Sequence, residues 1–328
     1  MMVPPPTPNR PLNVPAAVAI ARSLRARSRG TGGDTSEHEG NDRYGSVPAG
    51  PAVMGKLAQL IRPLREDPGS SAVLCDVDGT LAPIVTDPGA AAVPAEAREV
   101  LRALARPYAL VACISGRRAL DARSIVGVDE LAYAGNHGLE LLRPGAEVPT
   151  VDPAVTDKAR AVREFVLDLE TTTLLDGGLR LEDKGPIQAL HWRGAADERA
   201  AEAEANKIAG AAREAGLEPH WGRKVLEIRP LAGIDKGTAV RRLLEEDGVA
   251  LALYAGDDRT DLDAFRELRA LLAADSLRVA VCMGIASEEA PPELAADADA
   301  TVDGTGGFLG VLRALAPPTA AAPEPDRH

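Results

Sequence analysis

Two carboxylates stand one residue apart at the end of a short apolar run. The stretch LCDVDGTLAP, residues 74–83, places Asp76 and Asp78 where a buried strand should end. Side chains of a strand alternate between its two faces, so both acids would project to the same side. Because like charges repel, a metal ion, a lysine or water must separate them. Such a pair is suited to nucleophilic and acid–base chemistry.

Further polar residues follow other apolar runs of the chain. They are Ser115, Gly116 and Arg117 after YALVACI, Asp257, Asp258 and Asp261 after ALALYAG, and Lys236 at the start of a helical pattern. In open α/β sheets, ligands bind beyond the carboxyl ends of the strands. We therefore expect these residues to converge with the first two acids at one edge of a sheet.

The residue types fit hydrolysis of a phosphate ester. Asp76 is placed to attack phosphorus, which would divide one difficult displacement into two easier ones. Asp76 and Asp257 offer the hard oxygen ligands that suit Mg²⁺, a cation that commonly bridges carboxylates and phosphate oxygens. Asp78 would then protonate the leaving alcohol and activate the water of the second step.

A bound phosphate would also need cations and hydrogen-bond donors. Lys236 could balance its charge, while Ser115 and the amides near Gly116 could hold its oxygens. Each feature alone has an ordinary explanation: a pair of acids as a turn or helix cap, a Ser-Gly pair as a turn, a lysine as a solvated charge. The combination favours chemistry, since one chain places these residues after its strands and, for Lys236, at the start of a helix.

Composition limits the class of protein. The 328 residues suggest one large domain or two moderate ones. A formal net charge of −12 argues against nucleic-acid or anionic-membrane binding, so the expected partner is a small molecule. Cys75, Cys113 and Cys282 lie in apolar contexts without CxxC spacing, which fits a reducing cytoplasm. No stretch approaches the roughly 20 apolar residues of a membrane span, and a monomer is favoured although the oligomeric state stays open.

Apolar runs alternate with helical patterns in two parts of the chain. The runs are SAVLCDV, YALVACIS, LAYAG, ALALYAG and LRVAVCMG. This alternation predicts parallel strands joined by right-handed crossovers, that is, a doubly wound, Rossmann-like α/β sheet.

The block between these parts has a different pattern of helical and strand-like segments. It contains two long helical patterns, over 156–170 and 196–215, and strand-like GLRLEDKG, IQALHWRG and KVLEIRP. Because helix–strand alternation resumes afterwards, we expect an α+β domain inserted in the sheet domain. The predicted organisation is a disordered extension over 1–50, a core over 51–140 and 230–316, an inserted cap over 141–229 and a disordered tail over 317–328. Gly and Pro punctuate 141–145 and 230–233, which are the expected hinges.

The first 50 residues are rich in proline, glycine and polar side chains, which is typical of disorder. Residues 16–30 could form a short basic helix, and up to Gly33 the chain has arginines but no acids, as transit peptides do. No secretory apolar core or cleavage site is evident, so a cytoplasmic location is the expectation.

Four segments resemble, in order, the four motifs of the haloacid dehalogenase (HAD) superfamily of phosphohydrolases: DVDGTLAP, CISGR, DKGTAV and AGDDRTD. Within that superfamily the chain is similar to the trehalose-6-phosphate phosphatase family, through AGNHGLE (134–140), LEDKGPIQALHWR (181–193), GRKVLEIRP (222–230) and GDDRTDLDAF (256–265). The likeness covers about residues 71–315. It implies a HAD core with a C2-type cap, and Mg²⁺-dependent hydrolysis of trehalose 6-phosphate, a step of trehalose biosynthesis, through an aspartyl-phosphate.

The resemblance also implies roles by position. Asp76 matches the nucleophile, Asp78 the acid/base whose main-chain carbonyl also binds Mg²⁺, and Asp257 the metal carboxylate. Ser115 and Lys236 match the phosphate-holding pair.

Other positions match substrate contacts or acids near the metal. The substrate positions are Gly116, Arg117, Glu182, Lys184, Arg193 and Glu227, and the acids near the metal are Asp258 and Asp261, acting as ligand support or through water. The chain departs from the family at Leu262, where an acid is more frequent, and at Trp192, where tyrosine is usual.

The cap strands carry charges of both signs on one face. Glu182 and Lys184 are two residues apart, as are Glu227 and Arg229, so each pair would share one strand face. Carboxylates that accept and cations that donate hydrogen bonds suit a disaccharide, which has many hydroxyl groups and no net charge. From the residues alone, an outer sheet face that is simply exposed to solvent explains these charges equally well. His137 is expected either as a hydrogen-bonded residue at the core–cap junction or as a substrate contact, and His191 and Trp221 could be packing residues.

Two rival functions stay open. One is a phosphatase for another sugar phosphate that uses the same core, and the other is a noncatalytic regulatory module that retains the fold. A phosphomutase is less favoured because its phosphoenzyme must outlast substrate exchange.

Overall fold

The computed structural model describes residues 51–85, 88–151, 153–169, 174, 177–222, 224–288 and 290–317. The predicted extension over 1–50 and nearly all of the predicted tail lie outside the described residues. None of the helices in these ranges is long and apolar enough to cross a membrane.

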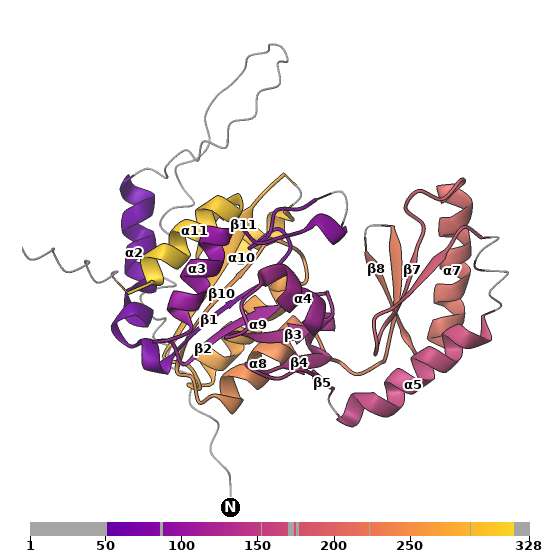
Figure 1. Ribbon diagram of the computed structural model, residues 1–328, viewed down its shortest axis with the longest axis horizontal. Coiled ribbons are helices and arrows are strands. Elements are labelled where there is room, and N and C mark those ends of the chain that lie inside the picture. Colours follow the sequence, from indigo (N-terminus) through magenta and orange to yellow (C-terminus); the bar gives the residue numbers. More distant parts are fainter. Residues whose placement is uncertain are drawn as a thin grey trace, which may run out of the picture. The chain divides into compact units, whose positions relative to one another are not determined.

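A large mixed sheet forms the main layer of the fold (Figure 1). Its strands are β1 (Ser71–Cys75), β2 (Leu110–Ile114), β3 (Ala132–Gly135), β4 (Glu140–Leu142), β5 (Thr150–Val151), β10 (Leu251–Gly256), β11 (Val279–Ala286) and β12 (Ala300–Asp303). Their order is β12-β11-β10-β1-β2-β3-β4-β5, and the pairs from β12 to β3 are all parallel. Buried runs such as SAVLC form its centre because both faces of a parallel sheet are covered.

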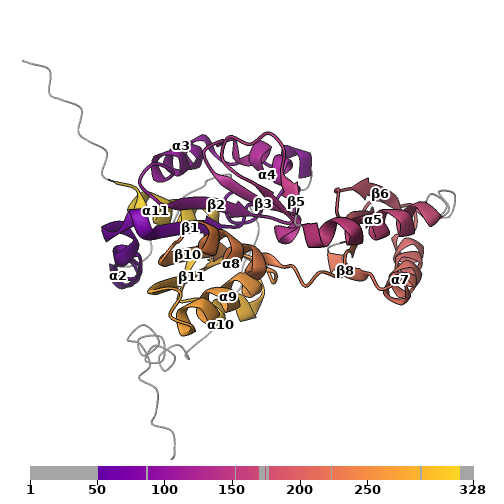
Figure 2. The ribbon, with the colours of Figure 1, turned by 90° about the horizontal axis from the view of Figure 1, so that it is seen from below.

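Helices cover both faces of this sheet. Figure 2 shows α3 (Ala95–Leu104) and α4 (Ala119–Val126) on one side, and α8 (Lys236–Glu246), α9 (Asp261–Ala273) and α10 (Pro292–Asp297) on the other. α2 (Pro51–Glu66) and α11 (Gly304–Leu315) complete the first apolar layer, and single 3₁₀ turns span Pro68–Ser70, Pro88–Ala90 and Asn136–Gly138. Alternate residues of β1 serve the two layers: Val73 and Cys75 pack with α3, whereas Ala72 and Leu74 pack with α8. The predicted doubly wound α/β core is confirmed.

A second sheet lies in the chain between β5 and α8. It is fully antiparallel, with the order β6 (Arg180–Asp183), β7 (Gln188–His191), β9 (Val225–Arg229) and β8 (Glu218–Gly222). α5 (Pro153–Asp168) and α7 (Glu198–Glu214) share an apolar cluster with one face, which Leu190, Leu226 and Ile228 supply. Trp192 is buried in this cluster, edge-to-face against Trp221 at a ring distance of 5.8 Å. Trp192 therefore serves packing.

The start of the inserted part differs from the predicted boundary at 141. β4 and β5 extend the large sheet, with Leu142 paired to Tyr133 and Thr150 paired to Leu141, both antiparallel. By strand pairing, the smaller part begins after Val151. Antiparallel edge strands need only short reversals of the chain, and the alternation of longer elements used in the prediction does not register them.

Candidate active site

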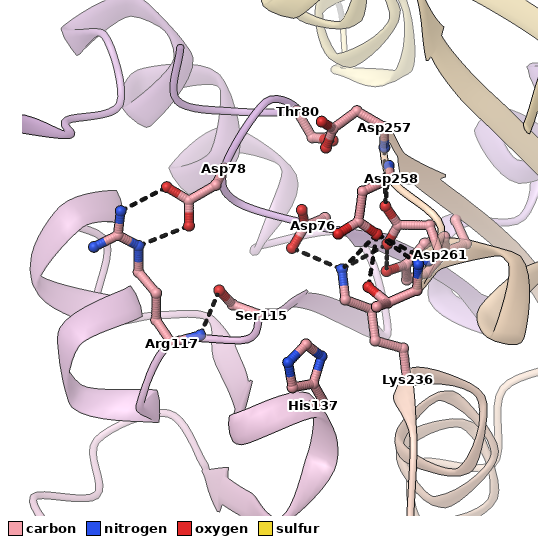
Figure 3. A network of polar contacts seen from close by, with 12 residues as sticks. Asp76, Asp78, Thr80, Ser115, Arg117, His137, Lys236, Asp257, Asp258 and Asp261 are labelled. Carbon is pink, nitrogen blue, oxygen red and sulfur yellow. Dashed lines mark hydrogen bonds and ion pairs between the residues drawn. The ribbon is translucent and has the colours of Figure 1, made fainter. Parts of the chain in front are cut away.

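Lys236 lies at the centre of a buried polar cluster (Figure 3). It is the first residue of α8, and the preceding Asp235 caps the helix through a capping box with Thr238. Its Nζ lies 2.7 Å from Asp261 Oδ1 and 3.1 Å from Asp76 Oδ1, while only 2% of the residue is exposed. Burial opposes its charge, but these acids together raise the pKa of Lys236 well above its ordinary value. The ammonium therefore stays protonated and offsets one negative charge.

Asp261 organises the loop that precedes α9. Its Oδ1 accepts hydrogen bonds from Lys236 and from the hydroxyl of Tyr254 (2.6 Å). Its Oδ2 accepts from the main-chain N–H groups of Asp257 and Asp258, both at 2.9 Å. A carboxylate has about four lone-pair sites, so these four donors occupy Asp261 fully. Asp261 therefore fixes the positions of its neighbours rather than offering a free ligand atom.

Only glycine fits at position 256 in this arrangement. A Cβ there would lie 2.1 Å from Asp261 Cγ. The sequence reasoning named Asp261 but missed Tyr254, which is fully buried within β10. A tyrosine inside an apolar strand was the available signal, since a buried hydroxyl needs a partner.

The residues fit a divalent metal ion. Asp76, Asp257 and Asp261 each offer one carboxylate oxygen, and these oxygens lie within 4.8 Å of one another. Burial, followed by the neighbouring acids, raises the pKa of Asp257 to about 7, and burial raises the pKa of Asp76 well above its usual range. One lysine cannot neutralise three crowded acids. Because Asp261 is occupied, Asp76 and Asp257 are the carboxylates with oxygens available to a cation.

The turn after β1 fits closely around Asp257. Thr80 donates a hydrogen bond to Asp257 Oδ1 at 3.2 Å, and Gly79 adopts a left-handed backbone (φ +82°). A Cβ at Gly79 would lie 2.1 Å from Asp257 Oδ2. Thr80 is a further contact that the sequence reasoning did not single out.

Asp78 faces away from this cluster. Its carboxylate accepts two hydrogen bonds from the guanidinium of Arg117, at 2.6 and 2.7 Å. Figure 3 shows this pair on one side of Asp76 and Lys236 on the other. The carboxylates of Asp76 and Asp78 thus have different cationic partners, and the metal role implied for the Asp78 carbonyl stays a prediction.

The loop after β2 borders the site, in addition to the turn after β1 and the loop before α9. Ser115 is buried, and its Oγ accepts from the N–H of Arg117 at 3.1 Å. The ring of His137 stacks so closely over Gly116 that a Cβ there would lie 2.8 Å from the ring. Figure 3 places Ser115 and His137 beside the Asp76–Lys236 contact.

Asp258 lies at the rim and fixes the turn into α9. Its Oδ1 accepts from both the N–H and the hydroxyl of Thr260, at 2.7 and 2.6 Å. Burial opposes ionisation, but Lys236 and these hydrogen bonds lower the pKa of Asp258 to about 2. These bonds match the capping alternative, and the nearby Lys236 (3.9 Å) also ties Asp258 to the cluster.

The predicted sugar-contact residues share one face of the small sheet only in part. Strand pairing aligns Glu182, Ala189, Glu227 and His220 in one row across the sheet. Glu227 contacts Lys184 at 2.9 Å and Arg229 at 2.6 Å. Despite its burial, these two cations lower the pKa of Glu227 to about 2.

The remaining two predicted cap residues lie outside this cluster. Glu182 pairs with His191, its Oε2 lying 2.6 Å from Nε2, so His191 is more than a packing residue. Arg193 is exposed in the turn after β7.

Comparison with known families agrees with the motifs. The sequence profile described as trehalose-phosphatase matches residues 74–291. The chain belongs to this family. The predicted membership of the HAD superfamily and of its trehalose-phosphatase branch is thereby confirmed.

Curated relatives of the trehalose-phosphatase family align over part of their length. "Probable trehalose-phosphate phosphatase 4" of Oryza sativa subsp. japonica is 32% identical over 228 residues, which cover 67% of this chain and 60% of that protein. "Trehalose-phosphate phosphatase" of Mycobacterium avium (strain 104) is 38% identical over 204 residues, covering 60% and 51%. An uncharacterized glycosyl hydrolase of Mycobacterium tuberculosis (strain ATCC 25618 / H37Rv) is 37% identical over 240 residues, but only 17% of its length is matched.

Solved structures share the fold. The C-terminal domain of C. albicans trehalose-6-phosphate phosphatase superposes with a TM-score of 0.59 at 22% identity, over 79% of this chain and 96% of that one. A trehalose-6-phosphate phosphatase related protein gives 0.54 at 22% identity, over 74% and 95%. A HAD core with a cap is therefore the fold of this family member.

Proposed function

We propose that this protein hydrolyses trehalose 6-phosphate to trehalose and inorganic phosphate, with Mg²⁺ as cofactor, as a step of trehalose biosynthesis in the cytoplasm. The observation that carries the proposal is the buried contact of Lys236 with Asp76, beside Asp257, at the carboxyl ends of β1 and β10. Family membership supplies the substrate class. The chain spans about half to two thirds of the trehalose-phosphate phosphatases it matches, so the activity of the whole protein is inferred from this shared part.

Asp76 is the proposed nucleophile. Its Oδ1 is fixed by Lys236, which leaves Oδ2 to attack phosphorus and form an aspartyl-phosphate. A magnesium ion held by Asp76 and Asp257 would neutralise charge that the phosphate brings into the site. Ser115 and the amide of Gly116 would donate hydrogen bonds to the phosphate oxygens.

Asp78 is the proposed acid and base. It would give a proton to the leaving sugar oxygen, and then take a proton from the water that attacks the phosphoenzyme. In the structure Asp78 is bound by Arg117, so this pair must separate before a proton can pass to the sugar. Arrival of the phosphate dianion offers Arg117 an alternative acceptor.

The small sheet is proposed to recognise the sugar. Lys184, which follows β6, forms an ion pair with Glu227 on β9, and such a pair offers both donors and acceptors to sugar hydroxyl groups. The inserted part that follows Val151, up to residue 229, would act as a cap that closes over the core, excludes water and selects the disaccharide.

The decisive experiment measures phosphate release from trehalose 6-phosphate, glucose 6-phosphate and sucrose 6-phosphate, with and without Mg²⁺. We expect strong preference for trehalose 6-phosphate and loss of turnover without the metal. Comparable release from all three substrates would retain a phosphatase but remove the trehalose assignment.

An Asp76→Asn variant tests the nucleophile directly. Turnover should fall by about 10⁴-fold or more, because loss of a catalytic nucleophile leaves only binding and electrostatic assistance. Its fold should persist, since Lys236 keeps Asp261 as a partner. Appreciable activity in this variant would require another nucleophile, and an unchanged cellular role would favour a noncatalytic module.

A further inference from the structure

Residues Ser115–Arg117, which are proposed to hold the phosphate, are called the phosphate loop. Asn136 and His137 bind its main chain on both sides of Gly116. The N–H of Asn136 donates to the carbonyl of Arg117 at 2.7 Å, and the N–H of His137 donates to the carbonyl of Ser115 at 2.9 Å. Both residues adopt left-handed backbone conformations, with φ of 51° and 59°. Such conformations are uncommon outside glycine, although Asn and His adopt them more readily than most residues, and the surrounding contacts help to hold them.

The His137 side chain takes the place of a side chain at Gly116. Its Cε1 and Nε2 both lie 2.8 Å from the position that a Cβ of Gly116 would occupy. Because the two are in close contact, a displacement of the ring would shift the loop, and a displacement of the loop would shift the ring.

The same two residues reach the small sheet with their side chains. Asn136 Nδ2 donates to the carbonyl of Lys184 at 2.8 Å. His137 Nε2 lies 3.9 Å from Glu227 Oε2, and the side chain of Glu227 in turn binds Lys184 and Arg229. Two of the predicted sugar residues, Lys184 and Glu227, thus connect to the phosphate loop through one pair of neighbouring residues.

The His137 ring is neutral and polar rather than an ion-pair partner. Burial, with the nearby cation Arg229, lowers the pKa of His137 to about 3. Its Nδ1 is buried and has no hydrogen-bond partner among the described residues. An apolar ring would pack over Gly116 without that cost, so packing alone does not explain a histidine here.

We propose that Asn136 and His137 are positioning residues that couple occupancy of the sugar site on the small sheet to the geometry of the phosphate loop. The inference rests on the proposed function, because it assumes that Lys184 and Glu227 bind sugar. When the sugar binds to Lys184 and Glu227, the positions of the Lys184 carbonyl and the Glu227 carboxylate become fixed. Through their contacts, Asn136 and His137 then fix the positions of Ser115 and Gly116. The chain would then discriminate its sugar phosphate from a small phosphate ester in the catalytic step as well as in binding.

Coupling between two sites is reciprocal, which makes it measurable without turnover. The affinity of inorganic phosphate is measured by calorimetry with Mg²⁺ present, with and without trehalose, and with sucrose and glucose as alternative sugars. In the wild type we expect one of the sugars to tighten phosphate binding about 5- to 100-fold. Asn136→Gly, which keeps the left-handed backbone, and His137→Phe, which keeps a ring, should reduce that factor to near one while phosphate alone still binds.

Two further variants sharpen the test. His137→Gln retains a polar terminus and should restore part of the coupling that His137→Phe loses. Lys207→Ala removes an ion pair with Glu204 within α7, a contact outside the expected hinges, and should leave the coupling intact. Melting temperatures measured on the same samples distinguish loss of coupling from loss of fold.

The inference is overturned if no sugar changes phosphate affinity in the wild type, or if Asn136→Gly and His137→Phe retain the full effect. It is equally overturned if Lys207→Ala abolishes the coupling to the same extent. The proposed function is judged separately by hydrolysis of trehalose 6-phosphate. Coupling with sucrose rather than trehalose would support the inference and count against the trehalose assignment.

Discussion

Arg117 binds both carboxylate oxygens of Asp78, with Nε 2.6 Å from Oδ2 and Nη2 2.7 Å from Oδ1. This two-point contact occupies both oxygens of Asp78 as hydrogen-bond acceptors, whereas a general acid must offer a proton to its substrate. The two residues belong to the loops after β1 and β2. If Asp78 is the acid of the proposed mechanism, this contact must open before Asp78 can give a proton to the leaving group.

Replacement of Asp78 by asparagine should separate the two chemical steps. With p-nitrophenyl phosphate, whose leaving group needs no proton, we expect a burst of about one p-nitrophenol per active site. Steady-state release should then be about 10²- to 10⁴-fold slower than in the wild type, because no base activates water. Rapid-quench or stopped-flow absorbance measures the burst.

A matched control for this variant is Asp121→Asn. Asp121 is exposed on α4 and acts on Arg117 through its charge, so near wild-type turnover is expected. Undiminished steady-state turnover in Asp78→Asn would remove Asp78 from the mechanism.

Asp257→Asn should remove most of the stabilisation that we expect from the proposed cofactor Mg²⁺. A ligand that binds only the folded state at 100 times its dissociation constant adds about 2.7 kcal/mol to the free energy of unfolding. The variant loses one of the two carboxylates with free oxygens, so most of this gain should disappear. Thermal unfolding with and without Mg²⁺ measures it.

Asp263→Asn is the control for the metal prediction. Asp263 lies on the same helix as Asp261, but its carboxylate pairs with Arg266. It should retain the full Mg²⁺-dependent rise in melting temperature, and a full rise in Asp257→Asn would contradict the assigned site.

Asp261→Asn should destabilise the fold more than any other single change in the cluster. It leaves an amide group facing donors at Tyr254 or at the N–H groups of Asp257 and Asp258, and weakens the partnership with buried Lys236. Breaking a buried ion pair typically costs about 3–5 kcal/mol. Tyr254→Phe removes one hydrogen bond and should cost about 1 kcal/mol.

Urea denaturation of the two variants compares these free energies of unfolding. A loss in Asp261→Asn no greater than that in Tyr254→Phe would show that Asp261 is not the organising group of the site.

His137 should make stability depend on pH between 7 and 5. Burial and Arg229 lower the pKa of His137 from 6.5 to about 3, so the folded protein stays unprotonated while the unfolded chain takes up a proton. Its contribution is therefore present above pH 6.5 and is lost as the pH falls toward 3. The expected loss from pH 7 to pH 5 is about 2 kcal/mol.

His137→Gln should remove that part of the slope. Free energies of unfolding of the wild type and the variant, measured in urea at several pH values, give the difference. Parallel slopes would mean that His137 titrates normally in the folded protein.

Residue order along the chain was sufficient for the fold class and for the set of catalytic candidates. Buried runs of strand length between amphipathic helices specify a doubly wound sheet, and such a sheet brings residues after its strands to one edge. Asp76, Asp257 and Lys236 could therefore be grouped although they are far apart in sequence. That grouping depends on element type and order, which local patterns carry.

The tertiary structure alone decided which groups are partners. Periodicity gives the face of a strand, but not the neighbour that folding brings to it. The pairing of Asp78 with Arg117, of Glu182 with His191, and the four hydrogen bonds to Asp261 depend on strand register and on the paths of loops. Donors and acceptors are matched only when distant segments meet at distances near 3 Å, and no spacing within one segment encodes that meeting.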